Sequence, residues 1–303
     1  MNIYLDSKVS DDRRRAQLYG GAIFVHSPSP GAVALCRLAR ELVEEAFRPL
    51  DPLTLHKKLP AEKCAEILAV LKPKFIHHPE AKRHIRAMLA ELDCDLKKTY
   101  FDVPRLRTAF AGDYLKSGIA YAFHAHRDTW YSAPFCQINW WMPVYEVQSE
   151  NCMALHPHYF SRRIRNGSSQ YNYHKWNAES RHNAARHVKT DTRMQPHAEE
   201  PLELEPEIRM VCPVGGAYQF SAAHLHSTAP NTSGVTRFSV DFRTVHLDDV
   251  LQREGAPNVD SECTGTTMGD YLNGTDLSHL PKEAIALYED GTETEYALSP
   301  ATR

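Results

Sequence analysis

From Lys98 to residue 156, and again from residue 208 to 247, the chain consists of short runs rich in Val, Ile, Tyr, Phe and Trp. The runs read YFDV, GIAYAFHAHRD, CQINWWMPVYEV, CMALHP, IRMVCPV, AYQFSA and RFSVDFRTVHL. Each has the residue types of a β-strand, and Gly, Pro and Asn stand between them where a parallel α/β protein would place helices. This pattern limits the fold more than any other feature, and it predicts a mainly β protein with a jelly-roll core, a double-stranded β-helix.

The first 97 residues have a different, helical character. Residues 31–49 place apolar side chains three and four positions apart, and residues 60–72 and 79–93 repeat that spacing. A short strand is expected near residues 20–26. We therefore expect one domain overall, in which a helical N-terminal region supports and flanks the β core.

The expected core spans residues 98–247, and a polar, basic stretch at about 157–200 interrupts it. Between Ser161 and Arg193 stand eight Lys or Arg residues and two Asp or Glu residues. Because this stretch is too long for an ordinary loop, we interpret it as a functional insert or as a disordered segment. Residues 248–303 form a polar tail that is expected to pack on the core, with a short helix over 282–288.

Composition narrows the class of protein. The chain has 303 residues and a net charge of −3, which argues against a generally basic nucleic-acid binder. No window approaches the roughly 18 uninterrupted apolar residues of a membrane span. The start, MNIYLDSKVSDDRRR, lacks the basic-then-apolar order of a signal peptide, which predicts a cytoplasmic protein. Seven dispersed cysteines without a CxxC pair fit neither a disulfide framework nor a zinc ribbon, and no pattern points to an oligomeric state.

The segment FHAHRDTWY at 123–131 carries the first candidate chemistry. Alternate residues of a strand face the same side, so His124, His126 and Asp128 are expected to point into one interior. A His-x-Asp pair offers an imidazole nitrogen and a carboxylate oxygen close together. These are two of the three ligands of a 2-His-1-carboxylate facial triad, the set used by iron(II) oxygenases. Alone, so short a motif often arises by chance.

The segment GGAYQFSAAHLHSTAPNTSGVTRFSVDFR, from residue 215, supplies the other half of the candidate site. We expect His226 to end one strand, residues 230–234 to form a turn, and Arg237 and Ser239 to share a face of the next strand. A dicarboxylate co-substrate that chelates iron at one end leaves its second carboxylate deep in the barrel. The Arg237 guanidinium can pair with that carboxylate bidentately, helped by the hydroxyl two residues on.

Three other assignments remain open at this point. The preferred distal ligand is His226, because it directly precedes the turn that leads to the arginine. The simplest interpretation of the two additional histidines, His124 and His224, is that they are hydrogen-bonded interior residues without a role as ligands. The alternatives are His124 in place of Asp128, as in the His-x-His pair of a cupin, His224 in place of His226, and Arg243 in place of Arg237.

Taken in order, these motifs resemble the iron(II)/2-oxoglutarate dioxygenases, most closely their phytanoyl-CoA-hydroxylase-like branch. His126-x-Asp128 is followed by His226 98 residues later and by Arg237 a further 11 residues on, which is similar to the order in that family. The resemblance covers about residues 98–247. It implies iron(II), 2-oxoglutarate and O₂ as cofactor and co-substrates, with Ser239 completing an Arg-x-Ser pair. It also implies three positions that line the co-substrate pocket, namely Gln137, Asn139 and Trp141.

The sequence constrains the identity of the substrate less than it constrains the metal ligands. The carboxylate of Asp128 occupies a position where the resemblance would show Gly or Ala in a halogenase, which favours hydroxylation. The basic insert, whose interleaved aromatic residues include Tyr171, Tyr173 and Trp176, is interpreted as a lid over an anionic small molecule: a phosphorylated metabolite, a nucleotide or an acidic sugar. A solvated loop is the equal alternative. Candidate substrate contacts are Arg127, Trp130, Tyr131, Arg162, Arg163, Arg165 and His174.

Other classes of function remain open from the sequence. A cupin-like isomerase or epimerase with zinc or no metal would have no use for Arg237 as a dicarboxylate anchor. A non-catalytic sugar- or nucleotide-binding jelly roll would use the histidines structurally. A protein or nucleic-acid hydroxylase is supported only by the basic insert.

Overall fold

The computed structural model describes residues 1–120, 124–179 and 193–289. Its core is a large sheet of eight strands in the order β1-β2-β8-β5-β10-β3-β11, with β4 also pairing with β10. A second sheet has the order β7-β6-β9. Apart from the parallel β1–β2 pair, the neighbouring strands run antiparallel. The strands are β1 (Ile3–Leu5), β2 (Ile23–His26), β3 (Thr99–Phe101), β4 (Arg105–Ala109), β5 (Ile138–Pro143), β6 (Met153–Leu155), β7 (Ile208–Met210), β8 (Ala217–Ser221), β9 (His226–Thr228), β10 (Arg237–His246) and β11 (Leu272–Asn273).

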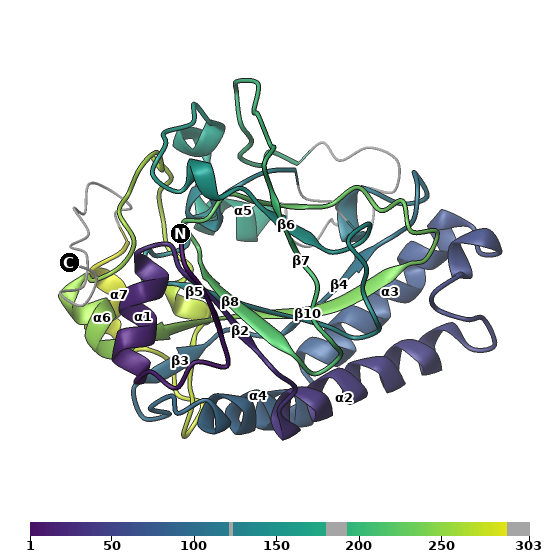
Figure 1. Cartoon of the computed structure of the whole chain (residues 1–303), viewed down its shortest axis with the longest axis horizontal. Helices are drawn as coiled ribbons and strands as arrows, with labels where there is room; N and C mark the ends of the chain where they lie inside the picture. The colour runs from purple at the N-terminus through teal and green to yellow at the C-terminus, as the bar shows by residue number, and fades with distance from the viewer. Residues whose placement is uncertain (121–123, 180–192, 290–303) are drawn as a thin grey trace.

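The long helices α2 (Pro30–Phe47), α3 (Ala61–Ile76) and α4 (Pro79–Glu91) cover one side of the large sheet, while the small sheet lies on the other side (Figure 1). The longer helices begin with ordinary N-terminal signals: Ser29 caps the second helix ahead of Pro30, and Pro79 opens the fourth. The helices are α1 (Asp11–Tyr19), α2 (Pro30–Phe47), α3 (Ala61–Ile76), α4 (Pro79–Glu91), α5 (Tyr173–Glu179), α6 (Leu247–Gln252) and α7 (Lys282–Ala286). Short 3-10 helices include η2 (Gly118–Ala120) and η3 (Asp128–Tyr131).

The two faces of the large sheet have different neighbours. Along β5, Ile138, Trp140 and Met142 join the main apolar core beneath the helices. Trp141 faces the other way and packs in a smaller core with residues of β6, β7 and β8. The side chains between the two sheets are therefore the ones that can line an internal site. Among the described residues, no helix is long and apolar enough to span a membrane.

Most of the sequence expectations for local structure are confirmed. The three predicted helices correspond to α2, α3 and α4, the predicted C-terminal helix to α7, and six of the seven predicted runs contain strands. The structure is a mixed sheet-and-helix protein with a sheet core. The helices are not confined to the N-terminal region, because α5, α6 and α7 follow the first strands of the core.

Two expectations around the candidate ligands are wrong. The run at 118–128 is not a strand in its described part: residues 118–120 form η2, His126 makes only an isolated bridge, and Asp128 begins η3. Residues 121–123 lie outside the described residues. His226 begins β9 and does not end a strand. The sequence pattern failed here because these residues are ordered by side-chain partners more than by a continuous ladder.

Candidate metal and co-substrate site

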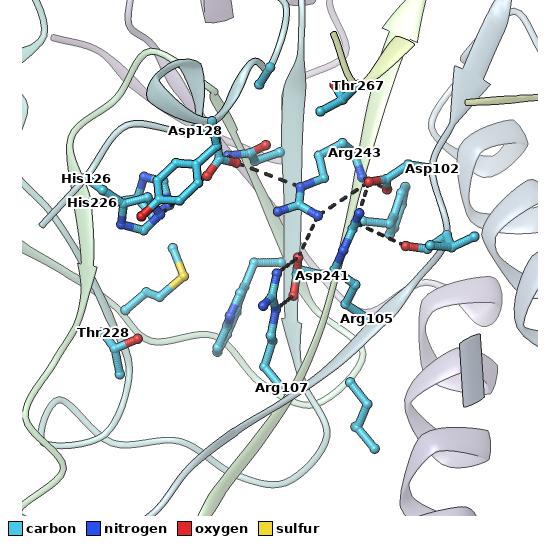
Figure 2. Close-up of a pocket in the computed structure, with 18 of the residues that line it drawn as sticks. Asp102, Arg105, Arg107, His126, Asp128, His226, Thr228, Asp241, Arg243 and Thr267 are labelled. Carbon is cyan, nitrogen blue, oxygen red and sulfur yellow. Dashed lines mark hydrogen bonds and ion pairs between the residues drawn. The ribbon is translucent and has the colours of Figure 1, made fainter. Parts of the chain in front are cut away.

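Three potential metal ligands converge where the segment before β5 meets the start of β9 (Figure 2). They are His126, Asp128 and His226, which are all buried and each offer one ligand atom within 4.8 Å of the others. The Nε2 atoms of His126 and His226 lie 3.4 and 3.7 Å from Asp128 Oδ1. The arrangement has the ligand set of a facial triad.

Hydrogen bonds fix both imidazoles in the form that a metal requires. The backbone N–H of His126 donates to the backbone carbonyl of His226 at 3.0 Å, and the backbone N–H of His226 donates to the carbonyl of His126 at 2.9 Å. Nδ1 of His126 lies 2.7 Å from the His124 carbonyl oxygen, and Nδ1 of His226 lies 3.0 Å from that of His224. Because a carbonyl oxygen only accepts, each Nδ1 carries a proton, and in the neutral ring Nε2 is then the atom that offers a lone pair to a metal.

The carboxylate of Asp128 is oriented through one of its two oxygens. Oδ2 accepts hydrogen bonds from Asn139 Nδ2 at 2.8 Å and from Gln137 Nε2 at 3.1 Å. The Tyr271 hydroxyl donates to Gln137 Oε1 at 2.7 Å and so orients that amide. Oδ1 is thereby left facing the two histidines. Hydrogen bonds of this kind to a ligating carboxylate stabilise its orientation toward the metal.

The protonation states also suit a divalent metal. Burial and the neighbouring His126 lower the pKa of His226 to about 4, so its imidazole is neutral at physiological pH. Burial opposes ionisation of Asp128, but the hydrogen bond with His126 and the charge of Arg243 outweigh it and hold its pKa well below the ordinary range. Neutral imidazole and ionised carboxylate are the forms that bind metal.

The three ligands open into a cavity of about 410 Å³ whose wall includes Arg237, at the start of β10. The Arg237 side chain donates through Nη1 to the Asn151 carbonyl at 3.2 Å and lies 5.6 Å from the centre of the Trp141 ring. Its Nε has no hydrogen-bond partner, and no carboxylate of the described residues lies within 4.0 Å of its guanidinium. Burial lowers the pKa of Arg237. A buried cation in this situation gains from an anionic ligand.

Two buried hydroxyl groups lack hydrogen-bond partners near this arginine. Ser239 is two residues further along the same face of β10 and is fully buried. Tyr218 stacks on Trp141 with ring centres 5.0 Å apart, and its hydroxyl also lacks a partner. Neither residue is among those that line the cavity, but buried hydroxyls and a guanidinium Nε without partners among the described residues are donors that a carboxylate can accept from.

Arg243, the alternative anchor, lies at the other end of the same strand face and is surrounded by carboxylates. Its Nη1 lies 3.4 Å from Asp102 Oδ2 and 3.6 Å from Asp241 Oδ2, and its Nε lies 3.8 Å from Asp128 Oδ2. Burial disfavours its charge, yet Asp102 and Asp241 more than compensate and raise its pKa. Carboxylates of the chain thus neutralise the charge of Arg243. Figure 2 shows that ion pairs continue from these carboxylates to two further arginines, Arg105 and Arg107.

The two alternative histidines do not join the metal cluster. His224 is fully buried, its Nε2 lies 3.1 Å from the Gly21 carbonyl oxygen, and burial lowers its pKa to about 3. The side chain of His124 is exposed. The arrangement therefore favours Asp128 and His226 as ligands, and it gives the carbonyl groups of the other two histidines an orienting role.

Of the substrate contacts predicted next to the metal motif, only Tyr131 lines the cavity, with its ring 5.5 Å from that of His126. Arg127 and Trp130 are buried elsewhere and share one carboxylate. Arg127 Nε lies 3.1 Å from Asp260 Oδ2, and Trp130 Nε1 donates to Asp260 Oδ1 at 2.8 Å. These two side chains fasten the segment that carries the ligands to the C-terminal part of the chain. Gln137, Asn139 and Trp141 all line the cavity.

The described part of the basic insert divides into two groups. Tyr171, Tyr173 and Trp176 form part of the cavity wall, together with Arg193 and Gln195. Residues 180–192 lie outside the described residues. The predicted basic contacts are exposed and do not line the cavity; they are Arg162 over the Tyr159 ring, Arg163 paired with Glu262, Arg165 bonded to the Glu199 carbonyl, and His174 paired with Glu289.

Sequence reasoning missed several residues of the cavity. Asp241 had a signal, because it alternates with Arg237, Ser239 and Arg243 along β10 and so gives one strand face a polar residue at every second position. Asp102, which pairs with Arg243, had no such signal, because the two residues are far apart in the sequence. Lys72 also had a signal, as a lysine among the apolar positions of α3.

Comparison with known proteins gives structural likenesses only. No family model matches the chain, and no curated protein matches it. The non-heme monooxygenase ThoJ covers 78% of this chain and 77% of its own at 12% identity, with a TM-score of 0.41. EvdO2 from Micromonospora carbonacea var. aurantiaca, complexed with 2-oxoglutarate, covers 79% and 92% at 13% identity, with a TM-score of 0.43. The epimerase SnoN, in complex with Fe³⁺, alpha ketoglutarate and nogalamycin RO, covers 78% and 83% at 16% identity, with a TM-score of 0.38. Likeness at this level does not assign a function, which has to be argued from the residues of this chain.

Proposed function

We propose that this protein is a non-haem iron(II), 2-oxoglutarate-dependent oxygenase. In this proposal His126, Asp128 and His226 hold the metal, and Arg237 holds the far carboxylate of 2-oxoglutarate. The observation that carries it is the presence, in one cavity, of a three-ligand cluster and a buried arginine with no carboxylate partner among the described residues.

The residues present fit this pair of cofactor and co-substrate. Two imidazole nitrogens and one carboxylate oxygen leave further coordination positions on iron for 2-oxoglutarate and O₂. The partnerless Nε of Arg237 and the hydroxyl of Ser239 are donors, and a carboxylate accepts from both. A cupin-like isomerase with zinc or no metal would have no use for Arg237 as a dicarboxylate anchor.

When bound, iron(II) with 2-oxoglutarate supplies the oxidation of a substrate C–H bond by O₂, with release of succinate and carbon dioxide. The chain contributes orientation and exclusion of water. Gln137 and Asn139 keep Asp128 turned toward the histidines. The Phe220 ring, 5.1 Å from that of His226, and Trp141 give the cavity apolar walls beside the ligands.

We further propose that the reaction is hydroxylation of a small anionic metabolite, such as a phosphorylated compound, a nucleotide or an acidic sugar. Asp128 supports hydroxylation over halogenation because its carboxylate fills a coordination position that a halide would need. The mainly antiparallel large sheet and the small antiparallel sheet, both of which contribute residues to the cavity wall, support a jelly-roll description. The relationship to the phytanoyl-CoA-hydroxylase-like branch remains a prediction from motif order.

The test is an anaerobic titration of the metal-free protein with iron(II) and then 2-oxoglutarate, followed by visible absorption. A chelated iron–ketoacid complex gives a charge-transfer band, which we expect in the wild type. The band should be absent in His226→Ala, while circular dichroism shows that this variant stays folded. A folded wild-type protein that binds no iron and gives no band would reject the proposal and direct attention to zinc and the cupin-like alternative.

A further inference from the structure

One cation of the cavity wall is used neither by the metal site nor by the ion pairs described above. Lys72 lies near the C-terminal end of α3, between the buried residues Leu71 and Phe75. Its ammonium donates a hydrogen bond to the carbonyl of Ile119 in η2, and its side chain lines the cavity. A helix that otherwise packs against β4 thus sends one charged group into the site.

Lys72 has no counter-charge of its own. Among the described residues, no carboxylate lies within 4.0 Å of its ammonium nitrogen. Burial lowers the pKa of Lys72 to about 7; the nearby Arg107 lowers it further, while Asp241 and Cys64 act in the opposite direction. A lysine in a cavity wall with no carboxylate partner among the described residues is stabilised in its charged form when an anion binds next to it.

The charge of the described cavity wall points the same way. Among the described residues that line the cavity, six side chains are cationic and three are carboxylates. Iron(II) and doubly charged 2-oxoglutarate cancel one another, so loading the site leaves the excess of positive charge in place. Such an excess in a cavity favours an anionic second ligand. The cations are Lys72, Arg105, Arg107, Arg193, Arg237 and Arg243, and the carboxylates are Asp102, Asp128 and Asp241.

The position of Lys72 separates it from the co-substrate anchor. Arg237 bonds to the Asn151 carbonyl and lies over Trp141, whereas Lys72 bonds to the η2 turn. Arg193 reaches the same turn, with its guanidinium 3.4 Å from the Gly118 carbonyl oxygen and 5.9 Å from the centre of the Trp176 ring. A cationic and aromatic corner therefore lies beside η2.

We propose that Lys72, flanked by Arg107 and Arg193, binds the acidic group of the substrate, a carboxylate or a phosphate, while the substrate body lies against the aromatic residues of the insert. This inference rests on the proposed function, because it assigns the second ligand of the same cavity. It identifies α3 and η2, and not the exposed arginines at 162–165, as the elements that select an acidic substrate.

The test uses the protein loaded anaerobically with iron(II) and 2-oxoglutarate, so that Arg237 is occupied. Benzoate, phenyl phosphate and the neutral benzyl alcohol are titrated by calorimetry at pH 6 and pH 8. We expect the wild type to bind at least one of the two acids about tenfold or more tightly than the alcohol at pH 6. For benzoate, which is fully ionised at both pH values, this preference should decrease at pH 8, because the Lys72 ammonium loses its proton as the pH rises through about 7.

Three variants isolate the lysine. Lys72→Met should remove the preference for acids, and Lys72→Arg should keep it at both pH values because guanidinium stays charged. Lys74→Met, on an exposed residue of the same helix paired with Glu45, should behave as the wild type. Benzoate and phenyl phosphate separate the carboxylate class from the phosphate class. An acid preference that survives Lys72→Met, or no acid binding by the wild type, would overturn the inference.

Failure of this inference can be distinguished from failure of the proposed function. The visible iron–ketoacid band reports the co-substrate site alone. If the band is absent while Lys72-dependent acid binding persists in metal-free protein, the anion subsite stands and the oxygenase proposal is rejected. If the band forms and acid binding does not depend on Lys72, the oxygenase proposal stands and the subsite is rejected.

Discussion

The two ends of strand β10 carry the same side chain in opposite circumstances. Arg237 is buried at the start of the strand with no carboxylate partner among the described residues, and Arg243 is buried near its end among three carboxylates. A buried charge that carboxylates of the chain neutralise contributes to the structure, whereas a buried charge without such a partner gains from a ligand of opposite charge. The two arginines therefore differ in whether carboxylates lie beside the guanidinium, and not in how deeply the guanidinium is buried.

The largest effect on stability is expected at the paired end. Arg243→Met removes the cation that Asp102 and Asp241 share, although Arg105 and Arg107 still pair with them. Because breaking a buried ion pair from one side costs about 3–5 kcal/mol, we expect a loss of about 3 kcal/mol here. The free energy of unfolding, measured in urea, should fall by that amount. Arg237→Met is the matched control and should not lower it, because this change removes a charge that no carboxylate offsets. Equal decreases in the free energy of unfolding in Arg243→Met and Arg237→Met would contradict the different roles given to the two arginines.

The largest effect on ligand binding is expected at the other end. Arg237→Met should weaken 2-oxoglutarate binding by about 2–5 kcal/mol, which corresponds to roughly 30- to 4,000-fold in Kd. The measurement is the 2-oxoglutarate concentration that half-saturates the visible band of the iron-loaded protein. If Arg237→Met titrates like the wild type while Arg243→Met does not, the two roles have been exchanged.

A smaller effect is expected at the support of the metal-binding carboxylate. Asn139→Ala removes the 2.8 Å hydrogen bond to Asp128 Oδ2 while leaving that of Gln137. Loss of such a partner typically lowers metal affinity by roughly 10- to 100-fold. Competition with an iron chelator measures this change. Unaltered iron affinity would show that Arg243 and Gln137 hold Asp128 without Asn139.

The smallest effect is expected at the hydroxyl beside Arg237. Ser239→Ala removes a donor that has no partner within the chain, so folding stability should not decrease. Binding of 2-oxoglutarate should weaken by about 0.5–1.5 kcal/mol, the net contribution of one hydrogen bond. The same visible titration measures it. A loss as large as that in Arg237→Met would mean that the hydroxyl, and not the guanidinium, anchors the co-substrate.

The sequence predicted the elements whose periodicity is local. The helices α2, α3 and α4 and strands such as β5 and β10 follow from the spacing of their apolar residues. The segment around His126 and Asp128 did not follow, because its conformation depends on a bridge to His226 and on the remote carboxylate of Asp260. Alternation in sequence cannot reveal such long-range partners.

For the candidate site, the order of motifs predicted three potential ligands that lie together in the structure and one arginine that lines the same cavity. It could not separate Arg237 from Arg243, since the two share a strand face and differ only in neighbours from other strands. The sequence also favoured arginines of the insert as substrate contacts, and these arginines are exposed. A run of charged residues in a sequence gives no information on which of them are buried. Lys72 was overlooked because one lysine in an amphipathic helix usually faces solvent.

The central claim, that Arg237 awaits the second carboxylate of a ketoacid held by iron, is tested most directly by comparing two ligands. The measurement is the visible titration of iron-loaded wild type and Arg237→Met with 2-oxoglutarate and with 2-oxobutyrate, which lacks the second carboxylate. The wild type should strongly prefer 2-oxoglutarate, and Arg237→Met should bind both compounds equally and weakly. A wild type that does not distinguish the two compounds, or a variant that retains the preference, would contradict the account.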